Sequence, residues 1–310
     1  MKENTFMEIV TLLIHQNIIM VVYMACGYFL YKKKIITKAG SGDLGKMLLY
    51  LVMPMAIIKS YIREFSVELL LSFLISFGIS LMALILAILI SKLCFKNTSV
   101  VKQFGSAFSN AGFIGIPLVQ MVLGEEAVFY VASFVALLNI LQWTYGVFIF
   151  TKDKSVISIK KIITNPIVIG LCIGLLLFFL PIQLPAEITS VISTLASMNG
   201  PLAMIVLGTY LAQIRLSELF NDKGTYLCSV IRLFLIPVAT ALLLLALPDE
   251  YKTMKLALLF AAAAPVGANV AIFAQLYGQD YTEAVKDVCM STVFSIVSMP
   301  VITLLMNTIG

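Results

Sequence analysis

A polar stretch with helix-breaking residues lies inside one long hydrophobic run of this chain. Residues 109–118 read Ser-Asn-Ala-Gly-Phe-Ile-Gly-Ile-Pro-Leu, and contain Asn110, Gly112, Gly115 and Pro117. Proline removes a helical hydrogen bond and crowds the turn before it, and glycine adds backbone freedom. In a membrane, freed backbone groups must be satisfied by protein or by water in a cavity. Because such exposed carbonyls and half-helix ends often hold a solute or an ion, we interpret the stretch as half of a binding site.

A second interrupted stretch begins at Ala264 and reads Ala-Pro-Val-Gly-Ala-Asn-Val-Ala, so that Pro265, Gly267 and Asn269 again break a hydrophobic run. The alternative for each proline alone is a kink that only helps helices to pack. Two matching breaks favour a shared site, at which two broken helices cross near the middle of the membrane. The positive N-terminal ends of half-helices at such a crossing suit an anion, particularly a carboxylate.

Amide side chains are the sharpest candidates for contacts with a bound solute. Asn110 and Asn269 can donate to a carboxylate and accept from a polar group, although asparagine in membranes also bonds one helix to another. Asn139 and Gln142 are three residues apart and share one helix face. The residues predicted to bind the solute are Asn110, Gly112, Asn139, Gln142, Gly267 and Asn269. The residues predicted to break the helices are Gly115, Pro117 and Pro265.

Arg232 is expected inside a hydrophobic segment, shortly before Pro237. A charge at membrane depth is costly and marks a functional site by default. We expect a structural ion pair with Asp287, because a permanent cation would hold an anionic solute too firmly for easy release. The alternatives are a helical carbonyl end, a lipid phosphate or a snorkelling side chain. All acidic residues are expected near segment ends, so a proton relay built on buried acids has little support.

The composition is that of a polytopic membrane protein. Of the 310 residues, 61% are hydrophobic and 12% are charged, with a mean hydropathy of +1.03. Soluble domains average about 45–50% apolar and about 25% charged residues. The 21 basic and 16 acidic residues form no single patch, which argues against nucleic acid as a partner. The five cysteines and His15 have no metal-type or catalytic spacing. The sequence therefore predicts no enzyme, no cofactor, no metal cluster and no ATP-driven pump.

Ten hydrophobic segments are long enough to span a bilayer, which takes about 20 apolar residues. The first is too long for a cleaved signal peptide, and its basic cluster follows it instead of preceding it. The predicted spans are residues 6–31, 40–62, 67–95, 102–122, 125–150, 162–181, 186–211, 224–247, 253–276 and 281–308.

Basic residues set the expected orientation. If the N-terminus is outside, fourteen lysines and arginines fall in inside loops and five fall outside. The inside set is Lys32, Lys33, Lys34, Lys38, Lys92, Lys96, Lys102, Lys152, Lys154, Lys160, Lys161, Arg215, Lys223 and Lys286. The outside set is Lys2, Lys59, Arg63, Lys252 and Lys255. We therefore expect a multi-pass protein of the cell membrane with both termini outside.

The two halves of the chain resemble each other. Short motifs recur in the same order, for example those around Pro54 and Pro201. Because each copy has five spans, an odd number, the second copy would enter the membrane from the opposite side. We predict an all-α fold of two inverted five-helix repeats, residues 1–155 and 156–310, with broken crossing helices 4 and 9.

The chain resembles the auxin efflux carrier family, as a bacterial-type member. The family includes the plant PIN-formed auxin exporters and bacterial permeases for malate or malonate. The most specific pieces are residues 110–118, residues 264–267 and the run Phe-Ala-Gln-Leu-Tyr-Gly at 273–278. Asn139 and Arg232 also match family positions.

The resemblance implies a scaffold domain from spans 1, 2, 6 and 7 and a mobile transport domain from spans 3–5 and 8–10. Transport would follow an elevator motion, and two copies would pack through the scaffold as a homodimer in membrane lipid. Asn110 would contact the substrate carboxylate. Val270 stands where plant members have proline, so Gly267 and Asn269 must make the second break, and residues 152–161 replace a long cytoplasmic loop.

We therefore expect a secondary or facilitated carrier that exports a small organic anion, such as malate, malonate or an auxin-like acid. The alternative is a sodium-coupled symporter of bile-acid-transporter type, with sodium near the oxygens of Asn110 and Asn269; coupling to protons is also open. A channel or membrane receptor is the hypothesis from another class, but channels are usually symmetric rings around a pore.

Overall fold

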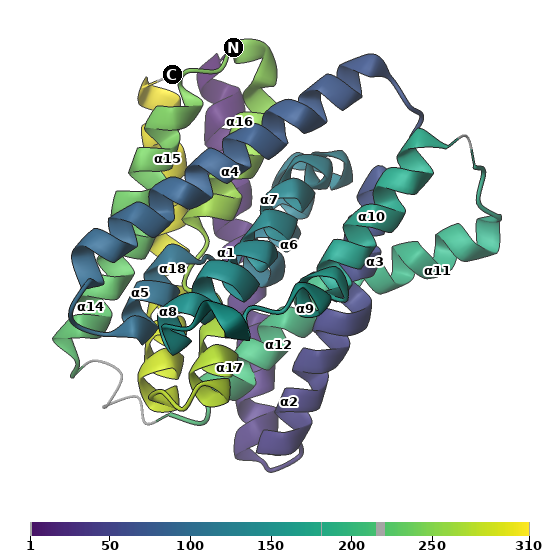
Figure 1. Cartoon of the computed structure of the whole chain (residues 1–310). Coiled ribbons are helices and arrows are strands. Elements are labelled where there is room, and N and C mark those ends of the chain that lie inside the picture. Colours follow the sequence, from purple (N-terminus) through teal and green to yellow (C-terminus); the bar gives the residue numbers. More distant parts are fainter. Residues whose placement is uncertain (1, 181, 215–220, 310) are drawn as a thin grey trace.

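The computed structural model describes residues 2–180, 182–214 and 221–309, and Arg215 of the basic set lies outside them. Throughout those residues the regular structure is helical, apart from one isolated antiparallel bridge between Ser109 and Val266. The helices form one bundle, in which the start of α1 (Lys2–Lys32) and the end of α18 (Tyr281–Ile309) lie at the same end (Figure 1).

Within the described ranges the helices follow one another at limits close to those of the predicted hydrophobic segments, and the number of membrane spans stays a prediction. After α1, the first half contains α2 (Lys38–Met47), η1 (Leu48–Val52), α3 (Met53–Tyr61), α4 (Val67–Phe95), α5 (Val100–Ala107), η2 (Ala111–Gly115), α6 (Ile116–Leu123), η3 (Glu125–Ala127), α7 (Val128–Leu141), η4 (Gln142–Gly146) and α8 (Val147–Thr151).

Two short helices, η5 (Lys154–Val156) and α9 (Ile159–Ile163), connect the halves. The second half continues with α10 (Pro166–Phe179), α11 (Ala186–Ser197), α12 (Asn199–Leu211), α14 (Lys223–Val230), η6 (Ile231–Leu235), α15 (Ile236–Leu244), η7 (Asp249–Tyr251), α16 (Lys252–Ala263), α17 (Asn269–Leu276) and finally α18.

Six helical segments in the part that the structure describes have the length and composition to cross a membrane. They are Lys38–Tyr61, Val67–Phe95, Glu125–Thr151, Ala186–Leu211, Lys223–Leu244 and Tyr281–Leu304. Three shorter apolar helices cover Ile18–Lys32, Ala111–Leu123 and Pro166–Phe179. The chain is therefore an all-helical, multi-pass membrane protein, whereas the inverted repeat stays a prediction.

In three helical segments, a proline follows shortly after a widened, π-helical turn. Pro54 follows η1, Pro117 follows η2 and Pro237 follows η6, each within the first two residues of the next α-helix. Proline has no N–H to donate and crowds the carbonyl four residues before it, and a π-turn places an extra residue at that point. Each helix can therefore continue past its proline.

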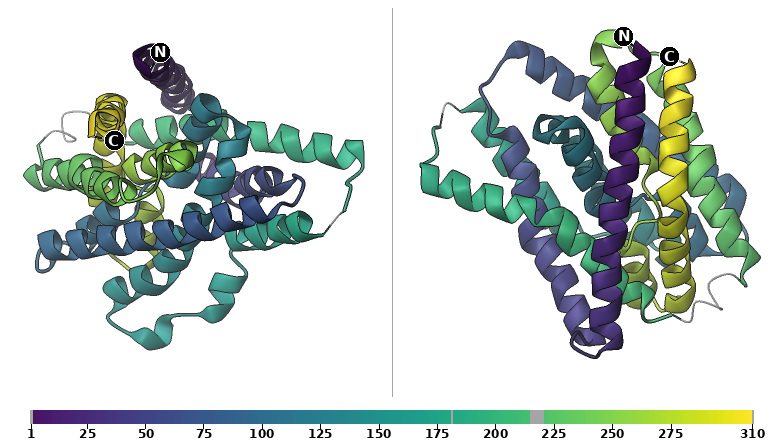
Figure 2. Two further views of the ribbon diagram at one scale, coloured as in Figure 1. Left: turned by 90° about the horizontal axis from the view of Figure 1, so that it is seen from above. Right: turned by 180° about the vertical axis from the view of Figure 1, so that it is seen from behind.

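Helices α1 and α12 touch backbone to backbone. A Cβ on Gly27 would collide with the carbonyl of Ile205, and a Cβ on Gly208 would collide with the carbonyl of Met24. Only glycine fits at either position. Helix α3 packs against α10 and α11, so that α1–α3 and α10–α12 form one group of helices (Figure 2). We call it the α1–α12 group.

The remaining helices form the second group, which we call the crossing group because it contains both interrupted stretches. Here α4 packs on α5 and α7, α16 packs on α7 and α15, and α18 packs on α14 and α17. Every residue of α16 from Met254 to Ala263 is buried. The two groups meet where α1 contacts α6 and α18 and where α7 contacts α3 and α10.

Candidate functional site

The two interrupted stretches meet at a crossing inside the bundle. The main-chain N–H of Asn110 donates to the Pro265 carbonyl over 2.7 Å, and the N–H of Gly267 donates to the Phe108 carbonyl over 3.0 Å. These two bonds flank the isolated antiparallel bridge. Helices α5 and α16 end at this point, and η2 and α17 begin just beyond it. The backbone groups that the two breaks release therefore satisfy one another, as a membrane interior requires.

Gly267 allows the two main chains to approach this closely. A Cβ on this residue would lie 3.0 Å from the carbonyl oxygen of Ser109, a main-chain atom that cannot rotate away. Pro265 follows the end of α16 and supplies an accepting carbonyl. Val270, where plant members of the resembled family have proline, already lies inside α17, which begins at Asn269. Pro265 and Gly267 thus make the second break before that position.

The first break continues into η2, which packs tightly on both helix groups. A Cβ on Gly115 would lie 3.3 Å from the Cα of Ala261 in α16. The carbonyl of Gly112 accepts a hydrogen bond from Asn199 Nδ2 over 3.3 Å, which links η2 to the start of α12. Pro117 follows in α6 and is buried.

Asn199, which contacts the site through the Gly112 carbonyl, is a residue that the sequence reasoning missed. It is fully buried, and its Oδ1 has no hydrogen-bond partner. The available signal was its place directly before Gly200 and Pro201, the pair that matches the motif around Pro54 in the first half. A polar residue beside a repeated helix-breaking motif is therefore the sequence signal that indicates Asn199.

Arg232 lies in η6 with 1% of its surface exposed, beside the carbonyl ends of both broken helices. Its Nη1 donates to the carbonyls of Ser106 over 3.0 Å and Ala107 over 3.2 Å at the end of α5. Its Nη2 donates to the carbonyl of Ala262 near the end of α16. The last carbonyls of a helix are unpaired and carry partial negative charge. One guanidinium therefore joins and neutralises the ends of both half-helices.

The expected ion pair between Arg232 and Asp287 is wrong. Helix carbonyls satisfy the guanidinium, because the crossing brings three of them within its reach, and the nearest cation to Asp287 Oδ1 is Lys102 Nζ, at 3.4 Å. Asp287 lies in the second turn of α18, near the start of its segment as expected, but it is deeply buried there. Its side chain is 0% exposed, since the packing of α18 on α5 and α14 encloses it.

The predicted amide side chains surround the crossing but have different partners. Asn269 Nδ2 donates to Gln142 Oε1 over 2.8 Å, and Asn139 Nδ2 donates to the Val135 carbonyl over 2.8 Å. In contrast, Asn110 Nδ2 and Gln142 Nε2 are buried donors without a hydrogen-bond partner. Two amide N–H groups are thus available to an acceptor that enters the site.

The amide side chains line a small cavity of about 20 Å³, together with Gly112, Gly267, Met53 and Phe113. A cavity needs about 10–15 Å³ to hold one water molecule, so this one has room for water and not for an organic solute. Met53 begins α3, whereas the crossing belongs to the other helix group. The small cavity therefore lies between the two groups.

A second cavity, of about 690 Å³, adjoins the crossing from the end of the molecule at which α2 begins. It shares Phe113 and Asn269 with the small cavity. Lys38 and Lys46 also line it, although Lys46 is paired with the exposed Asp43 at 2.9 Å. Cavities of about 300–1,000 Å³ are typical of small-molecule sites. We call this cavity the vestibule.

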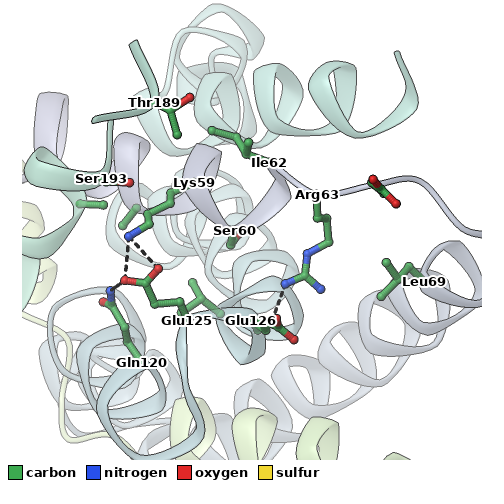
Figure 3. A pocket seen from close by; sticks show the side chains of 14 residues that line it. Lys59, Ser60, Ile62, Arg63, Leu69, Gln120, Glu125, Glu126, Thr189 and Ser193 are labelled. Atoms are coloured by element: carbon green, nitrogen blue, oxygen red, sulfur yellow. Dashed lines mark hydrogen bonds and ion pairs between the residues drawn. The ribbon is translucent and has the colours of Figure 1, made fainter. Parts of the chain in front are cut away.

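At the other end of the segment formed by α2, η1 and α3, polar contacts hold the two helix groups together. Lys59 Nζ lies 2.6 Å from Glu125 Oε2, and Gln120 Nε2 donates to Glu125 Oε1 over 3.3 Å (Figure 3). Arg63 Nη2 donates to the carbonyl of Glu126 over 3.3 Å. These residues line a cavity of about 460 Å³ that shares no lining residue with the crossing. The contacts thus join the end of α3 to the turn after α6.

Oxygen ligands for a metal ion are scarce in the described part of the chain. No group of three or more His, Cys, Asp or Glu side chains there is placed to hold a metal. At the crossing, the carbonyls of Phe108 and Pro265 accept main-chain N–H groups, and Gln142 Oε1 accepts from Asn269. These three oxygens at the crossing therefore already have donors.

Comparison with known proteins places the chain among membrane transporters. A family model described as "Membrane transport protein" (Mem_trans) matches residues 12–303. A curated protein of Rhizobium meliloti (strain 1021), named "Putative malonate transporter", is 24% identical over 210 residues. That match covers 65% of this chain and 65% of the relative, so the chain spans less than two thirds of that protein's length. Because the family model covers nearly the whole chain, this protein belongs to the Mem_trans family, the auxin efflux carrier family, and is a transporter and not an enzyme.

Proposed function

We propose that this transporter is a secondary or facilitated carrier for a small organic anion that bears a carboxylate, bound at the crossing. One observation carries the proposal: Asn110 Nδ2 and Gln142 Nε2 are buried donors without partners, and both residues line the cavity at the crossing. An ionised carboxylate only accepts hydrogen bonds, so it can satisfy both donors at once. The name of the Rhizobium relative makes malonate the first solute to test.

Helix ends support an anion without adding a full charge to the site. The N-terminal ends of η2 and α17 lie at the crossing and carry partial positive charge. The guanidinium of Arg232 already donates to three carbonyls on the other side of the crossing, so the anion site does not use its full charge. A site of partial charges and amides binds a carboxylate and still releases it, which a carrier must do in every cycle.

We assign the scaffold to the α1–α12 group and the mobile transport domain to the crossing group. Their contact at the small cavity supports an elevator motion, because a sliding boundary beside the bound solute would expose the solute first to one side and then to the other. The matching breaks in residues 1–155 and 156–310 support two inverted repeats. A homodimer would pack through the scaffold, where many apolar side chains of α1 and α10 are exposed.

The distribution of basic residues supports an orientation with the vestibule on the inside and both termini outside. On this assignment the structure represents an inward-facing carrier, with the Lys59–Glu125 pair closing the outer end. Lys38 and Lys46 would raise the local concentration of anions at the inner mouth. Capture at the inner mouth supports export as the direction of net transport.

Binding of small mono- and dicarboxylates is the direct test, measured as a thermal shift of purified protein with and without sodium, because a bound ligand stabilises the folded state. We expect at least one small carboxylate to raise the Tm of the wild type and of Asn97→Ala, which removes an exposed asparagine far from the crossing. The same ligand should leave the Tm of Asn110→Ala unchanged. An equal shift in all three proteins would place the site elsewhere.

Transport by proteoliposomes separates the carrier from the other hypotheses. Uptake of the carboxylate should saturate with concentration and should not depend on sodium. Uptake that requires sodium would favour the symporter, whereas a steady current without saturation would favour a channel. If no carboxylate moves under any gradient, the carrier proposal fails.

A further inference from the structure

A buried cluster of charges lies at the ends of α5, α14 and α18, apart from the crossing. Lys102 Nζ is 3.0 Å from Asp222 Oδ2, 3.1 Å from Glu283 Oε1 and 3.4 Å from Asp287 Oδ1. Thr225 Oγ1 donates to Asp222 Oδ2 over 3.0 Å. One ammonium therefore faces three carboxylates, and the proposed solute site uses none of these residues.

Of the three carboxylates in this cluster, that of Asp287 is the most deeply buried. Its side chain is 0% exposed, compared with 21% for Glu283 and 39% for Asp222, so water reaches the other two carboxylates. Asp287 Oδ2 is buried and has no hydrogen-bond donor. An ionised oxygen in that position is costly, because neither water nor a donor replaces its lost hydration. A single proton on Oδ2 would remove the cost and leave Oδ1 to accept from Lys102.

We propose that Asp287 is a proton-binding site, and that one proton binds and leaves there in each transport cycle. The inference rests on the proposed carrier function and extends it from the solute to the coupling ion. The proton comes from water at the partly exposed Glu283 and Asp222 and returns there, so no covalent bond other than O–H forms or breaks. With the proton bound, the Lys102 ammonium faces two ionised carboxylates, those of Asp222 and Glu283, and both are partly exposed.

Two short connections lead from this cluster to the crossing. Ser291, one helical turn beyond Asp287, donates through Oγ to the Asp287 carbonyl over 2.7 Å and accepts from the N–H of Val266 over 3.0 Å. On the other side, Ser106 Oγ donates to the Lys102 carbonyl over 2.7 Å. The main chains that carry Asp287 and Lys102 thus bond directly to residues at the crossing. A change of charge at Asp287 can therefore bias the geometry of the solute site.

The groups that face Asp287 come from each charged element packed around it. Lys102 lies on α5, Glu283 lies one turn earlier on α18, and Asp222 caps α14. Cys228 on α14 is buried beside the cluster, with its Sγ 3.8 Å from the Lys102 carbonyl. Arg232 on η6 is held by the helix carbonyls. Lys102 is thus the cation that contacts the carboxylate, and its contact is shared with the two other acids.

Infrared difference spectroscopy of the purified protein between about pH 6 and pH 9 tests the site without any solute, because exposed carboxylates stay ionised throughout that range. A protonated carboxyl gives a carbonyl-stretch band that an ionised carboxylate lacks. We expect one such band in the wild type and its loss in Asp287→Asn. The control is Asp249→Asn, which makes the same change at an exposed aspartate paired with Lys255 and should keep the band. A band unchanged by Asp287→Asn overturns the proposal.

A second variant keeps the test decisive if Asp287→Asn does not fold. Lys102→Gln removes only the ammonium, so the three carboxylates repel one another more and the protonated band should grow at a given pH. An unchanged band in folded Lys102→Gln contradicts the proposal. If sodium stabilises the wild type but not Asp287→Asn and no protonated band is found, the cation of the cluster is sodium and the proton assignment is wrong.

Proteoliposomes loaded with a pH-sensitive dye connect the site to transport. A carboxylate gradient should move protons through the wild type and through Asp249→Asn. Asp287→Asn should still exchange the carboxylate, with proton movement reduced to the level of empty liposomes. Proton movement at the wild-type rate in Asp287→Asn refutes the coupling. If no carboxylate moves in the wild type but the infrared band still depends on Asp287, the carrier proposal fails and the proton site stands.

Discussion

The two sides of the crossing have the same backbone role but different side-chain roles. On the first side, Asn110 presents an Nδ2 donor without a partner. On the second, Asn269 Nδ2 is bound to Gln142 Oε1 and the N–H of Val266 is bound to Ser291 Oγ. The first side is therefore open to a ligand, whereas the second is braced by its neighbours. Two matching breaks need not make equal contributions to binding.

Removal of Arg232 should destabilise both sides of the crossing, because this residue donates to carbonyls on each side. In Arg232→Met, three helix carbonyls lose their donor inside the bundle. We expect a loss of about 3–5 kcal/mol in the free energy of unfolding, seen as a large fall in the Tm of the purified protein. Arg63→Met removes one hydrogen bond to a carbonyl and a cation–π contact with Phe129 in a less buried place, and should therefore cost less than Arg232→Met. Equal losses would show that the carbonyl ends do not need the guanidinium.

Asn110→Ala should separate binding from stability on the open side. Its Nδ2 has no partner in the protein, so the Tm without ligand should stay close to that of the wild type. A hydrogen bond to a charged group contributes about 1.5–3 kcal/mol, and its loss should weaken carboxylate binding by roughly 10- to 150-fold. Calorimetric titration measures this affinity. A large fall in Tm with unchanged affinity would reverse the roles of the two sides.

Gly267→Ala should disturb the backbone crossing itself. The new Cβ would lie 3.0 Å from the carbonyl oxygen of Ser109, so the two main chains must move apart, at a cost of about 1–3 kcal/mol. Gly42→Ala is the matched control in α2, since a Cβ there meets nothing within 4 Å. Replacing a helical glycine by alanine stabilises by about 0.5–1 kcal/mol. Opposite signs of the two changes in Tm are expected, and a stabilising Gly267→Ala would contradict the close crossing.

Asn269→Ala should show the smallest effect, because it removes one neutral hydrogen bond from the braced side. The contact with Gln142 Oε1 contributes about 0.5–1.5 kcal/mol of stability. The affinity for the carboxylate should fall by less than in Asn110→Ala, as measured in the same titration. A loss of affinity as large as that of Asn110→Ala would mean that both sides bind the solute directly.

Hydropathy and helix-breaking residues were enough to predict most of the fold and the two breaks. Apolar spans of about 20 residues and the repeated Gly and Pro residues depend only on the residue types within one segment, so they can be recognised from the sequence. Partners across helices could not be predicted in the same way. For Arg232 the expected partner was Asp287 and a helical carbonyl end was an alternative, and only the folded structure, in which two helices end beside the guanidinium, decides between them. Asp287 is buried by two other helices, and nothing in its own segment reveals that.

The sequence also identified the amide side chains as candidates, but not which of them has a free hydrogen-bond donor. Asn110 and Asn269 look alike in the sequence, and each follows a break. Which of them keeps a free donor depends on Gln142, whose reach across the crossing follows from the packing of η4 beside α17. Residue type could identify the candidates, whereas hydrogen-bond partners distinguished them.

The crossing is held by main-chain bonds at Asn110 and Gly267, and this has an evolutionary consequence. Backbone pairing is indifferent to most side chains, so residues around it can be exchanged while the two arms stay joined. Exchanges at Asn139, Gln142 or Phe113 can therefore alter the size and polarity of the site without a new fold. If the solute binds there, selection for a new solute and selection for correct folding act on different atoms.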